Sequence, residues 1–471
     1  MARIGKMGET GIRVQLEGCP PPNVAHARLA ARHATTFILE SRDGPSRIAR
    51  YSIVGWSPAG ILRLDATGLH TTGVLPSPAV GEEPLVYVRR VLRDYRQLDH
   101  THPFVGGLVG CVGYDFARTL EPSLEVVGSA EPWPRLLLGL FLDALVYDHA
   151  KGTVHYVSVG PDRRADLEAL QAPATRIPLR IGPLAASCDA PRFAKMVHEA
   201  QALLRAGECF QMVLSRPYQA SFSGDLGECY DLLRDGEAAP YLYHLRYAGH
   251  PALELVGASP ETLVRVRAGK AETFPIAGTR PATGDATEDG AAARDLLTDR
   301  KEGAEHAMLV DLARNDLARV CRPGTVRVAR LRDVERSRNV QHLVSEVVGE
   351  LDEGRDALDA LAAVFPAGTV SGAPKVRAME HIARIEGTPR GAYAGAVCYA
   401  SFNGDFDSAI AIRSLSAIGD RLTVQAGAGI VLASDAAREF DETRRKAATM
   451  LQALRPFGAL VPRDETEVMA R

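Results

Sequence analysis

Short apolar segments separated by turn residues fill the second half of the chain, and this pattern most restricts the possible folds. YLYHLRY at 241–247 leads through a turn into ALELVG, and TLVRVR at 262–267 leads through another into AETFPI. Such pairs predict antiparallel hairpins. Helical periodicity occurs at 189–207, about 289–320 and 435–454, without regular alternation of strand and helix. The sequence therefore predicts an α+β fold rather than a doubly wound α/β fold.

The length of 471 residues predicts two or three domains. Residues 173–187 contain three prolines and little charge, which is typical of a linker. We therefore expect an N-terminal domain over residues 1–172, a second domain over residues 188–456 and a C-terminal tail over residues 457–471. The apolar run LLLGLFLDALVY at 136–147 is too short to span a membrane and predicts a buried strand.

Charge and cysteine usage exclude several classes of protein. With 55 Lys and Arg against 58 Asp and Glu, the net charge of −3 gives no reason to expect nucleic acid or a membrane as partner. The seven cysteines form no CxxC pair, so neither a zinc site nor a disulfide framework is expected. The N-terminus lacks the apolar region of a signal peptide. These features favour a cytoplasmic protein.

Glycine-rich stretches suggest close backbone contacts more readily than nucleotide binding. FVGGLVGCVGYDFA at 104–117 lacks the GK[ST] of a phosphate loop and favours a strand that another backbone approaches closely. SGAPK, which ends at Lys375, is also too short for that motif. In QAGAGI, Gly427 and Gly429 could bring main-chain N–H groups to an anion, or could form a simple bulge.

Acidic residues on two predicted helices could meet at a metal ion. Glu305 lies on the helix predicted near 289–320, and Glu439, Glu442 and Lys446 lie three and four residues apart on the last helix. Two carboxylates from separate helices could bind Mg²⁺ together with water and a substrate oxygen. Charge on a solvated helix surface is the ordinary alternative, and composition does not choose between the two.

Considered together, these stretches resemble the chorismate-utilising enzymes, and among them the component I (large) subunits of anthranilate synthase. The matches follow the family order over about residues 189–454: PIAGTRP, LVDLARNDLARV, HLVSEVVGEL, GTVSGAPKVRAMEHIA, YAGAVCY, IRSL, VQAGAGIVLASD and DETRRKA. FILES at 37–41 and RYSIVG at 50–55 extend the resemblance more weakly. It implies an α+β fold of two facing antiparallel sheets with helices outside and a substrate cleft between subdomains.

The resemblance also implies a role for residues at matching positions. A Mg²⁺ cofactor would be held by Glu305 and Glu442 and would bind the ring carboxylate of chorismate. The other implied substrate contacts and catalytic groups are Gly427, Ala428, Gly429 and Lys446 around the ring carboxylate, Tyr393 and Arg413 at the enolpyruvyl carboxylate, Gly278, Thr279 and Thr369 nearby, His342 for pyruvate elimination, and Glu261 as the acid that protonates the ring hydroxyl. From its residues alone, His342 among apolar neighbours is more often structural than catalytic.

Two positions separate the activities within this family. Relatives that add water to the ring have a lysine where this chain has Gln211, and aminodeoxychorismate synthases usually have a nucleophilic lysine where it has Ala277. The implied reaction is therefore that of a lyase of tryptophan biosynthesis, which converts chorismate and ammonia into anthranilate and pyruvate. A 2-amino-2-deoxyisochorismate synthase, an aminodeoxychorismate synthase component I and a non-catalytic regulator remain alternatives.

Ammonia supply and regulation are implied in the same way. We expect a separate glutamine amidotransferase subunit, component II, to supply the ammonia. Ser41 in ILES and Pro240 with Tyr241 resemble a family site for tryptophan as feedback inhibitor, although the second element departs from the family at Glu237, Ala238, Ala239 and Leu242. An ordinary edge strand and a core aromatic residue are the alternatives.

Overall fold

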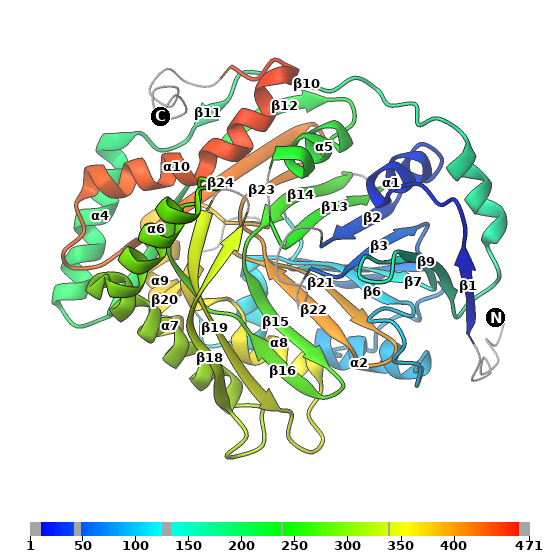
Figure 1. Cartoon of the computed structure of the whole chain (residues 1–471), viewed down its shortest axis with the longest axis horizontal. Helices are drawn as coiled ribbons and strands as arrows, with labels where there is room; N and C mark the ends of the chain where they lie inside the picture. Colours follow the sequence, from blue (N-terminus) through cyan, green and yellow to red (C-terminus); the bar gives the residue numbers. More distant parts are fainter. Residues whose placement is uncertain are drawn as a thin grey trace.

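Two large antiparallel β-sheets lie face to face, with helices on their outer sides (Figure 1). The computed structural model describes residues 11–41, 49–124, 133–236, 239–249, 251–337 and 340–460. Glu237, Ala238 and residues 461–471 of the expected tail lie outside the described residues. The arrangement confirms the predicted α+β class and the two facing sheets.

The first sheet has thirteen strands within the described ranges. Their order is β1 (Ile12–Leu16), β9 (Thr153–Ser158), β8 (Asp143–Asp148), β3 (Tyr51–Trp56), β2 (Thr36–Glu40), β13 (Tyr241–Tyr247), β14 (Leu253–Ser259), β23 (Ser414–Ile418), β24 (Arg421–Ile430), β12 (Gln211–Ser223) and β10 (Arg180–Ile181), with β11 (Ala185–Ala186) and β20 (Gly372–Ala373) also paired to β12. The predicted hairpin of β13 and β14 therefore lies near the middle of this sheet.

The second sheet has eleven strands in the same described part of the chain. Their order is β17 (Ile276–Pro281), β19 (Val340–Glu350), β16 (Lys270–Thr273), β15 (Thr262–Arg267), β22 (Phe406–Ile410), β21 (Ala396–Ser401), β6 (Gly107–Val112), β7 (Leu136–Phe141), β4 (Gly60–Asp65) and β5 (Gly68–Thr71), with β18 (Arg327–Ser337) paired to β19. Both sheets thus combine strands from before and after the proline-containing segment 173–187.

Alternation along the strands explains why both faces of each sheet are apolar. Successive side chains of a strand point to opposite faces. Phe37 packs in the core between the sheets, whereas its neighbour Ile38 packs under the outer helices of the first sheet. On the second sheet, Val109 faces the core between the sheets and Leu108 faces the outer helices. The two sheets therefore share one central core. The second sheet has one outer core and the first has two, the smaller of which contains Phe193 and Met212.

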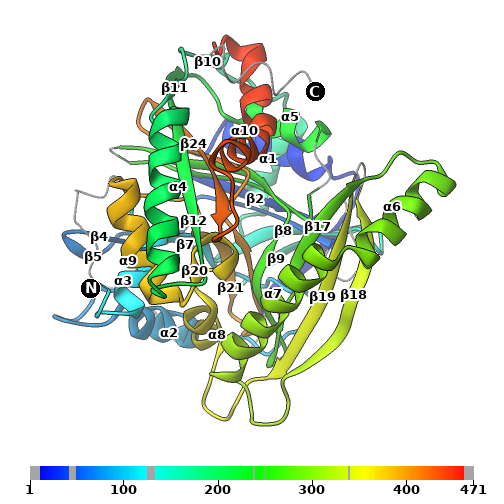
Figure 2. The ribbon, with the colours of Figure 1, turned by 90° about the vertical axis from the view of Figure 1, so that its left-hand side faces the viewer.

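Helices cover the outer faces. The first sheet is covered by α1 (Pro22–Ala30), α5 (Gly227–Gly236) and α10 (Ala436–Leu454), and the second by α2 (Pro84–Asp94), α3 (Ala117–Leu120), α7 (Arg300–Ala318) and α8 (Ala357–Val364). α4 (Ala190–Arg205) packs beside α10 and against α9 (Lys375–Glu386), and α6 (Ala286–Thr298) precedes α7 (Figure 2). The 3₁₀ helices are η1 (Tyr114–Phe116), η2 (Arg164–Gln171), η3 (Gly368–Val370) and η4 (Arg455–Phe457).

Local expectations hold with two differences. A helix was expected over 189–207, and the Asp189 side chain accepts the Arg192 N–H and begins α4 there. The run 136–147, predicted as one strand, is two strands in different sheets, because the chain crosses between the sheets at Leu142. The helical region near 289–320 is likewise two helices, divided at Asp299, whose side chain caps α7.

Close backbone approach explains the glycines of β6, as predicted. A Cβ on Gly110 would lie 1.9 Å from the carbonyl oxygen of Leu137 on the adjacent strand, which no side chain tolerates. No helix in the described part of the chain is long and apolar enough to cross a membrane.

Candidate functional site

A cavity of about 960 Å³ lies where the β12–β24 edge of the first sheet and α10 meet β17, β19 and α7. It is lined by nearly all of the predicted catalytic, substrate and metal residues: Glu261, Gly278, Thr279, Glu305, His342, Thr369, Tyr393, Arg413, Gly427, Gly429, Glu442 and Lys446. The exception is Ala428, whose side chain is fully buried on the opposite face of β24. Only its main chain could contact a ligand here.

Glu261 is held at the wall of this cavity just before β15. The Thr369 hydroxyl on η3 donates a 3.0 Å hydrogen bond to Glu261 Oε1. Burial raises the pKa of Glu261 to about 7, although the Thr369 hydrogen bond and the charge of Lys446 oppose the shift. Burial is the dominant cause of this increase. At neutral pH the carboxyl group therefore spends much of its time protonated and able to donate a proton.

His342 faces the cavity from β19. Its Nδ1 lies 3.1 Å from the carbonyl oxygen of Gly278, which only accepts, and 3.2 Å from the Thr279 hydroxyl, which can also accept, so a proton on Nδ1 satisfies both contacts. Burial lowers the pKa of His342, and the charge of Arg413 contributes in the same direction. The ring is therefore neutral near pH 7, with Nε2 as the nitrogen that can accept a proton.

A bulge in β17 aims the Gly278 carbonyl at this histidine. The register against β19 shifts between Ala277 and Thr279, and Gly278 has a φ of 60°. Glycine adopts this left-handed conformation without a steric penalty. The PIAGT motif thus determines which nitrogen of His342 remains available.

The glycines of β24 leave space beside α10. A Cβ on Gly427 would lie 2.7 Å from the Tyr393 hydroxyl, and one on Gly429 would lie 2.8 Å from the side-chain nitrogen of Gln211. Lys446 Nζ donates to the Gly427 carbonyl oxygen at 3.2 Å, so the main chain of Gly427 points to the edge of β24 nearest α10. In a β-strand the N–H and C=O groups of one residue point to the same edge of the strand. The edge of β24 to which the Gly427 carbonyl points can therefore also present N–H groups to an anion.

Tyr393 and Arg413 provide hydrogen-bond donors on the same wall. Burial raises the pKa of Tyr393 to about 12, so its hydroxyl keeps its proton. Arg413 has a φ of 51°, a strained conformation for a non-glycine residue and one often found at functional sites.

A buried ion pair supports this wall from behind. Arg390 Nη2 lies 2.7 Å from Glu386 Oε1, and the guanidinium lies 5.6 Å from the centre of the Tyr393 ring. Arg390 Nη1 also donates to the Val370 carbonyl oxygen at 2.7 Å, next to Thr369. The pair therefore fixes Tyr393 and the η3 turn relative to each other.

Acidic residues of α7 and α10 face each other across the cavity. Glu305 lies 3.5 Å from Lys301 Nζ, and Glu442 lies 2.7 Å from Lys446 Nζ. The pKa of Lys301 is raised mainly by the charge of Glu305 and to a smaller extent by that of Glu439 on α10. The two helices are therefore close enough to interact electrostatically. Within the described residues, no group of three or more His, Cys, Asp or Glu side chains is placed to hold a metal ion alone.

This donor set fits magnesium rather than zinc or a redox metal. Carboxylate oxygens are the ligands that Mg²⁺ prefers, and it commonly binds through one or two carboxylates together with water and substrate oxygens. Glu305 and Glu442 are therefore suitable as a pair, with the remaining ligands coming from elsewhere.

Sequence reasoning missed several charged residues of the cavity. Lys301 and Glu302 line it from α7, and Glu439, which the helical spacing had indicated without a role, lines it from α10. Lys301 and Glu302 precede Glu305 by four and three residues, and Glu439 precedes Glu442 by three. Each therefore lies on the same helix face as a predicted metal ligand, and this spacing could have identified them.

The two positions that separate family activities also line the cavity. Gln211 lies on β12 and Ala277 on β17. Neither side chain can attack the substrate as a nucleophile, and neither can activate water as a lysine amine would.

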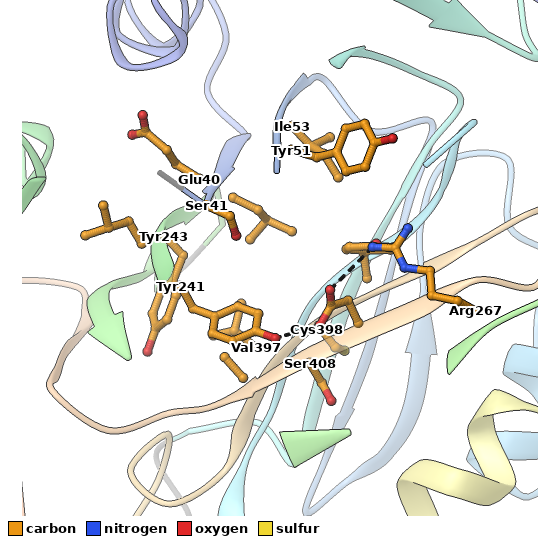
Figure 3. A pocket seen from close by; sticks show the side chains of 15 residues that line it. Glu40, Ser41, Tyr51, Ile53, Tyr241, Tyr243, Arg267, Val397, Cys398 and Ser408 are labelled. Carbon is orange, nitrogen blue, oxygen red and sulfur yellow. Dashed lines mark hydrogen bonds and ion pairs between the residues drawn. The ribbon is translucent and has the colours of Figure 1, made fainter. Parts of the chain in front are cut away.

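The predicted inhibitor residues gather at a separate pocket between the sheets (Figure 3). Ser41 and Tyr241 line it, whereas Pro240 contributes its carbonyl oxygen, which accepts the Ser41 hydroxyl at 2.7 Å. The Tyr241 hydroxyl lies 3.1 Å from Asp407, and Arg267 approaches that carboxylate at 3.6 Å. Figure 3 shows the Glu40 carboxylate turned away from Tyr241, in agreement with its ion pair to Arg234.

The pocket has a volume of about 50 Å³. A cavity of roughly 150 Å³ holds benzene, so a tryptophan side chain would enter only after the lining moved apart. The Tyr241 hydroxyl also lies 2.7 Å from Thr262 Oγ1, and Thr262 follows Glu261 directly. Movement of the lining would therefore reach the wall of the large cavity.

Comparison with known proteins agrees with this geometry. Residues 35–452 match the family described as chorismate binding enzyme. The chain is 40% identical over 449 residues to anthranilate synthase component 1 of Methanothermobacter thermautotrophicus, with 94% of each protein covered. It is 40% identical over 468 residues to that of Streptomyces coelicolor, with 93% of this chain and 88% of the relative covered.

A crystal structure of anthranilate synthase component I from Streptococcus pneumoniae has the same fold. The TM-score is 0.75 at 37% identity, and the match covers 85% of this chain and 92% of that one. Sequence and structure thus agree over most of the chain, which belongs to the family of chorismate binding enzymes.

Proposed function

We propose that this chain is the component I subunit of an anthranilate synthase, a lyase that converts chorismate and ammonia into anthranilate, pyruvate and water. The observation that carries the proposal is that Gln211 and Ala277 line the same cavity as Glu261 and His342. The cavity thus contains an acid and a base. At the two discriminating positions it has neither a lysine that could activate water nor a lysine that could attack the ring. Ammonia itself must then attack the ring.

In the first step, ammonia adds to the ring carbon next to the one that carries the carboxylate, and the ring hydroxyl leaves. Hydroxide is a poor leaving group, so a proton must be transferred to it. Glu261, whose pKa is raised to about 7 by burial, is suited to donate that proton. The products of this step are water, the Glu261 carboxylate and the ammonium form of 2-amino-2-deoxyisochorismate, which then loses its extra proton to water.

In the second step, the amino intermediate loses pyruvate and becomes aromatic. A base removes the proton from the ring carbon that bears the amino group, and the bond to the enolpyruvyl oxygen breaks. The neutral His342 side chain, with its proton held on Nδ1 by Gly278, offers Nε2 as that base. The released enolate takes up a proton at its methylene carbon and becomes pyruvate, and His342 gives up the proton that it removed.

Chorismate carries two carboxylates, and binding them in a buried cavity requires positive charge or hydrogen-bond donors beside each one. Arg413 and the protonated Tyr393 hydroxyl would hold the enolpyruvyl carboxylate. Glu305 and Glu442 would hold Mg²⁺, which when bound supplies the positive charge that the ring carboxylate needs. Lys446 would hold Glu442 in place and orient the main chain of Gly427.

We further propose the supply and control of this reaction. A glutamine amidotransferase, component II, would deliver ammonia, and tryptophan would bind at the pocket of Ser41 and Tyr241. The seven thiols of this chain are all free, which supports a cytoplasmic location.

The test is product analysis with the purified chain, chorismate, Mg²⁺ and an ammonium salt, read by anthranilate fluorescence and mass spectrometry. Anthranilate is the expected product. An amino-chorismate isomer without anthranilate would identify one of the two aminating alternatives. Absence of any turnover by folded protein would favour a non-catalytic regulator.

A further inference from the structure

A second, smaller cavity of about 50 Å³ lies behind Glu261, between α7, η3 and β15. It shares Glu261 and Thr369 with the large cavity and adds the carboxyl group of Asp316. Most of its other lining is apolar, from residues such as Leu263, Leu309 and Leu312. A cavity of this size with two carboxyl groups in its wall has room for a water molecule.

Asp316 connects this small cavity to solvent. It lies near the end of α7, and 14% of its side chain is exposed. Lys375 Nζ lies 3.5 Å from its carboxylate and also donates to the Val364 carbonyl oxygen at 2.8 Å. Burial raises the pKa of Asp316, and the charges of Lys375 and Arg319 oppose this. Asp316 belongs to the DLARND motif, and the proposed reaction leaves it without a role.

The proposed reaction creates a need for a proton at this place. Each turnover transfers the Glu261 proton to the leaving hydroxyl and leaves a carboxylate. Intermediates and products would occupy the large cavity, which Glu261 lines. The small cavity provides a second approach to the same carboxyl group.

We infer that Asp316 returns the proton to Glu261 through water in the small cavity. The Asp316 carboxyl group gives a proton to the water, the water gives one to the Glu261 carboxylate, and Asp316 regains a proton from solvent. Only O–H bonds form and break. Asp316 does not touch the substrate but acts through Glu261, so this inference rests on the proposed role of Glu261. A role limited to neutralising Lys375 is the alternative.

Single-turnover and steady-state kinetics of Asp316→Asn separate these roles. The complete chain is mixed with chorismate, Mg²⁺ and ammonium salt, and product is followed by fluorescence. With enzyme in excess and the pH held at about 6, Glu261 starts mostly protonated, so the rate should stay within about twofold of the parent chain. With substrate in excess, a burst of about one product per site should precede a steady state that is slower by roughly tenfold or more. Deuterium oxide should slow this steady state further.

Two companion variants keep the test independent of the Lys375 ion pair. Ala313→Val adds two methyl groups to the small cavity without changing any charge, and it should give the same burst. Asp311→Asn alters the same helix and motif at a side chain that is 68% exposed and paired with Arg314. This control should behave like the parent chain, and Asp316→Glu should restore most of the steady-state rate.

Two results overturn the inference. An unchanged steady-state rate in Asp316→Asn and Ala313→Val would mean that Glu261 regains its proton through the large cavity. An equal loss in single-turnover and steady-state rates would mean that Asp316 has a structural role. If the parent chain makes a different aminated product, the proposed function fails but the burst still tests the relay, because the ring hydroxyl leaves in that reaction too. A parent chain without turnover overturns both.

Discussion

Replacement of Glu261 by glutamine should stabilise the protein above neutral pH while it removes the catalytic acid. The pKa of this carboxyl group is raised from 4.5 to about 7 in the folded chain. As pH rises from 4.5 through 7, the unfolded chain releases this proton and the folded chain retains it, so folding becomes less favourable. The glutamine amide does not ionise and can still accept the Thr369 hydrogen bond.

The size of the effect follows from the shift. A difference of 2.5 pKa values, from 4.5 to 7, corresponds to about 3 kcal/mol at pH 8 and to about 1.4 kcal/mol at pH 5.5. Urea unfolding at the two pH values should therefore show a stability advantage of Glu261→Gln that grows with pH. Glu17→Gln, a change at an exposed residue, is the matched control and should show no such trend. A constant advantage, or none, would refute the buried and protonated state of Glu261.

Activity should change in the opposite direction. General acid catalysis contributes roughly 10²- to 10⁴-fold, or about 3 to 5 kcal/mol, so the variant should lose about that much of kcat. In the parent chain, kcat/KM should fall as pH rises above about 7, because Glu261 then loses its proton. It should also fall on the acid side below the lowered pKa of His342. A variant with near-normal kcat would show that another group donates the proton.

The remaining predictions concern the metal, the inhibitor and the buried ion pair. Glu442→Gln should raise the Mg²⁺ concentration for half-maximal activity by roughly tenfold or more; an unchanged Mg²⁺ titration would remove Glu442 from the metal site. Ser41→Ala removes the hydrogen bond to the Pro240 carbonyl and should weaken tryptophan inhibition in a dose–response assay, whereas identical inhibition curves would argue against the pocket. Arg390→Met leaves Glu386 buried without its partner and should cost about 3 to 5 kcal/mol in urea unfolding, and a stability like that of the parent would contradict the support role of this pair.

Much of the cavity could be predicted because its residues lie in motifs. Gly278, Glu305 and Gly427 belong to stretches that place polar groups beside glycine or on a helix face, whereas His342 stands among apolar neighbours and was indicated by the family resemblance alone. The structure brings all four to one cavity. The position of Ala428 follows from strand alternation, which turns its side chain away from its two glycine neighbours.

The rest depends on packing between distant segments. The electrostatic contact of Lys301 with Glu439 joins two helices that are separated by more than a hundred residues. The small cavity behind Glu261 exists because α7 packs on η3, where a Cβ on Gly368 would lie 2.0 Å from the Leu312 side chain. Likewise, the apolar run at 136–147 is interrupted only by Asp143, and this single residue does not predict that the chain crosses between the sheets at Leu142. No local pattern contains these relations.

The most direct test of the proposed mechanism is the product ratio formed by His342→Gln. A glutamine amide can still donate to the Gly278 carbonyl but cannot remove a proton from the ring. If Glu261 serves hydroxyl loss and His342 serves pyruvate elimination, mass spectrometry should show accumulation of 2-amino-2-deoxyisochorismate with little anthranilate or pyruvate. Anthranilate and pyruvate in parental amounts, or loss of the aminated product as well, would contradict this division of roles.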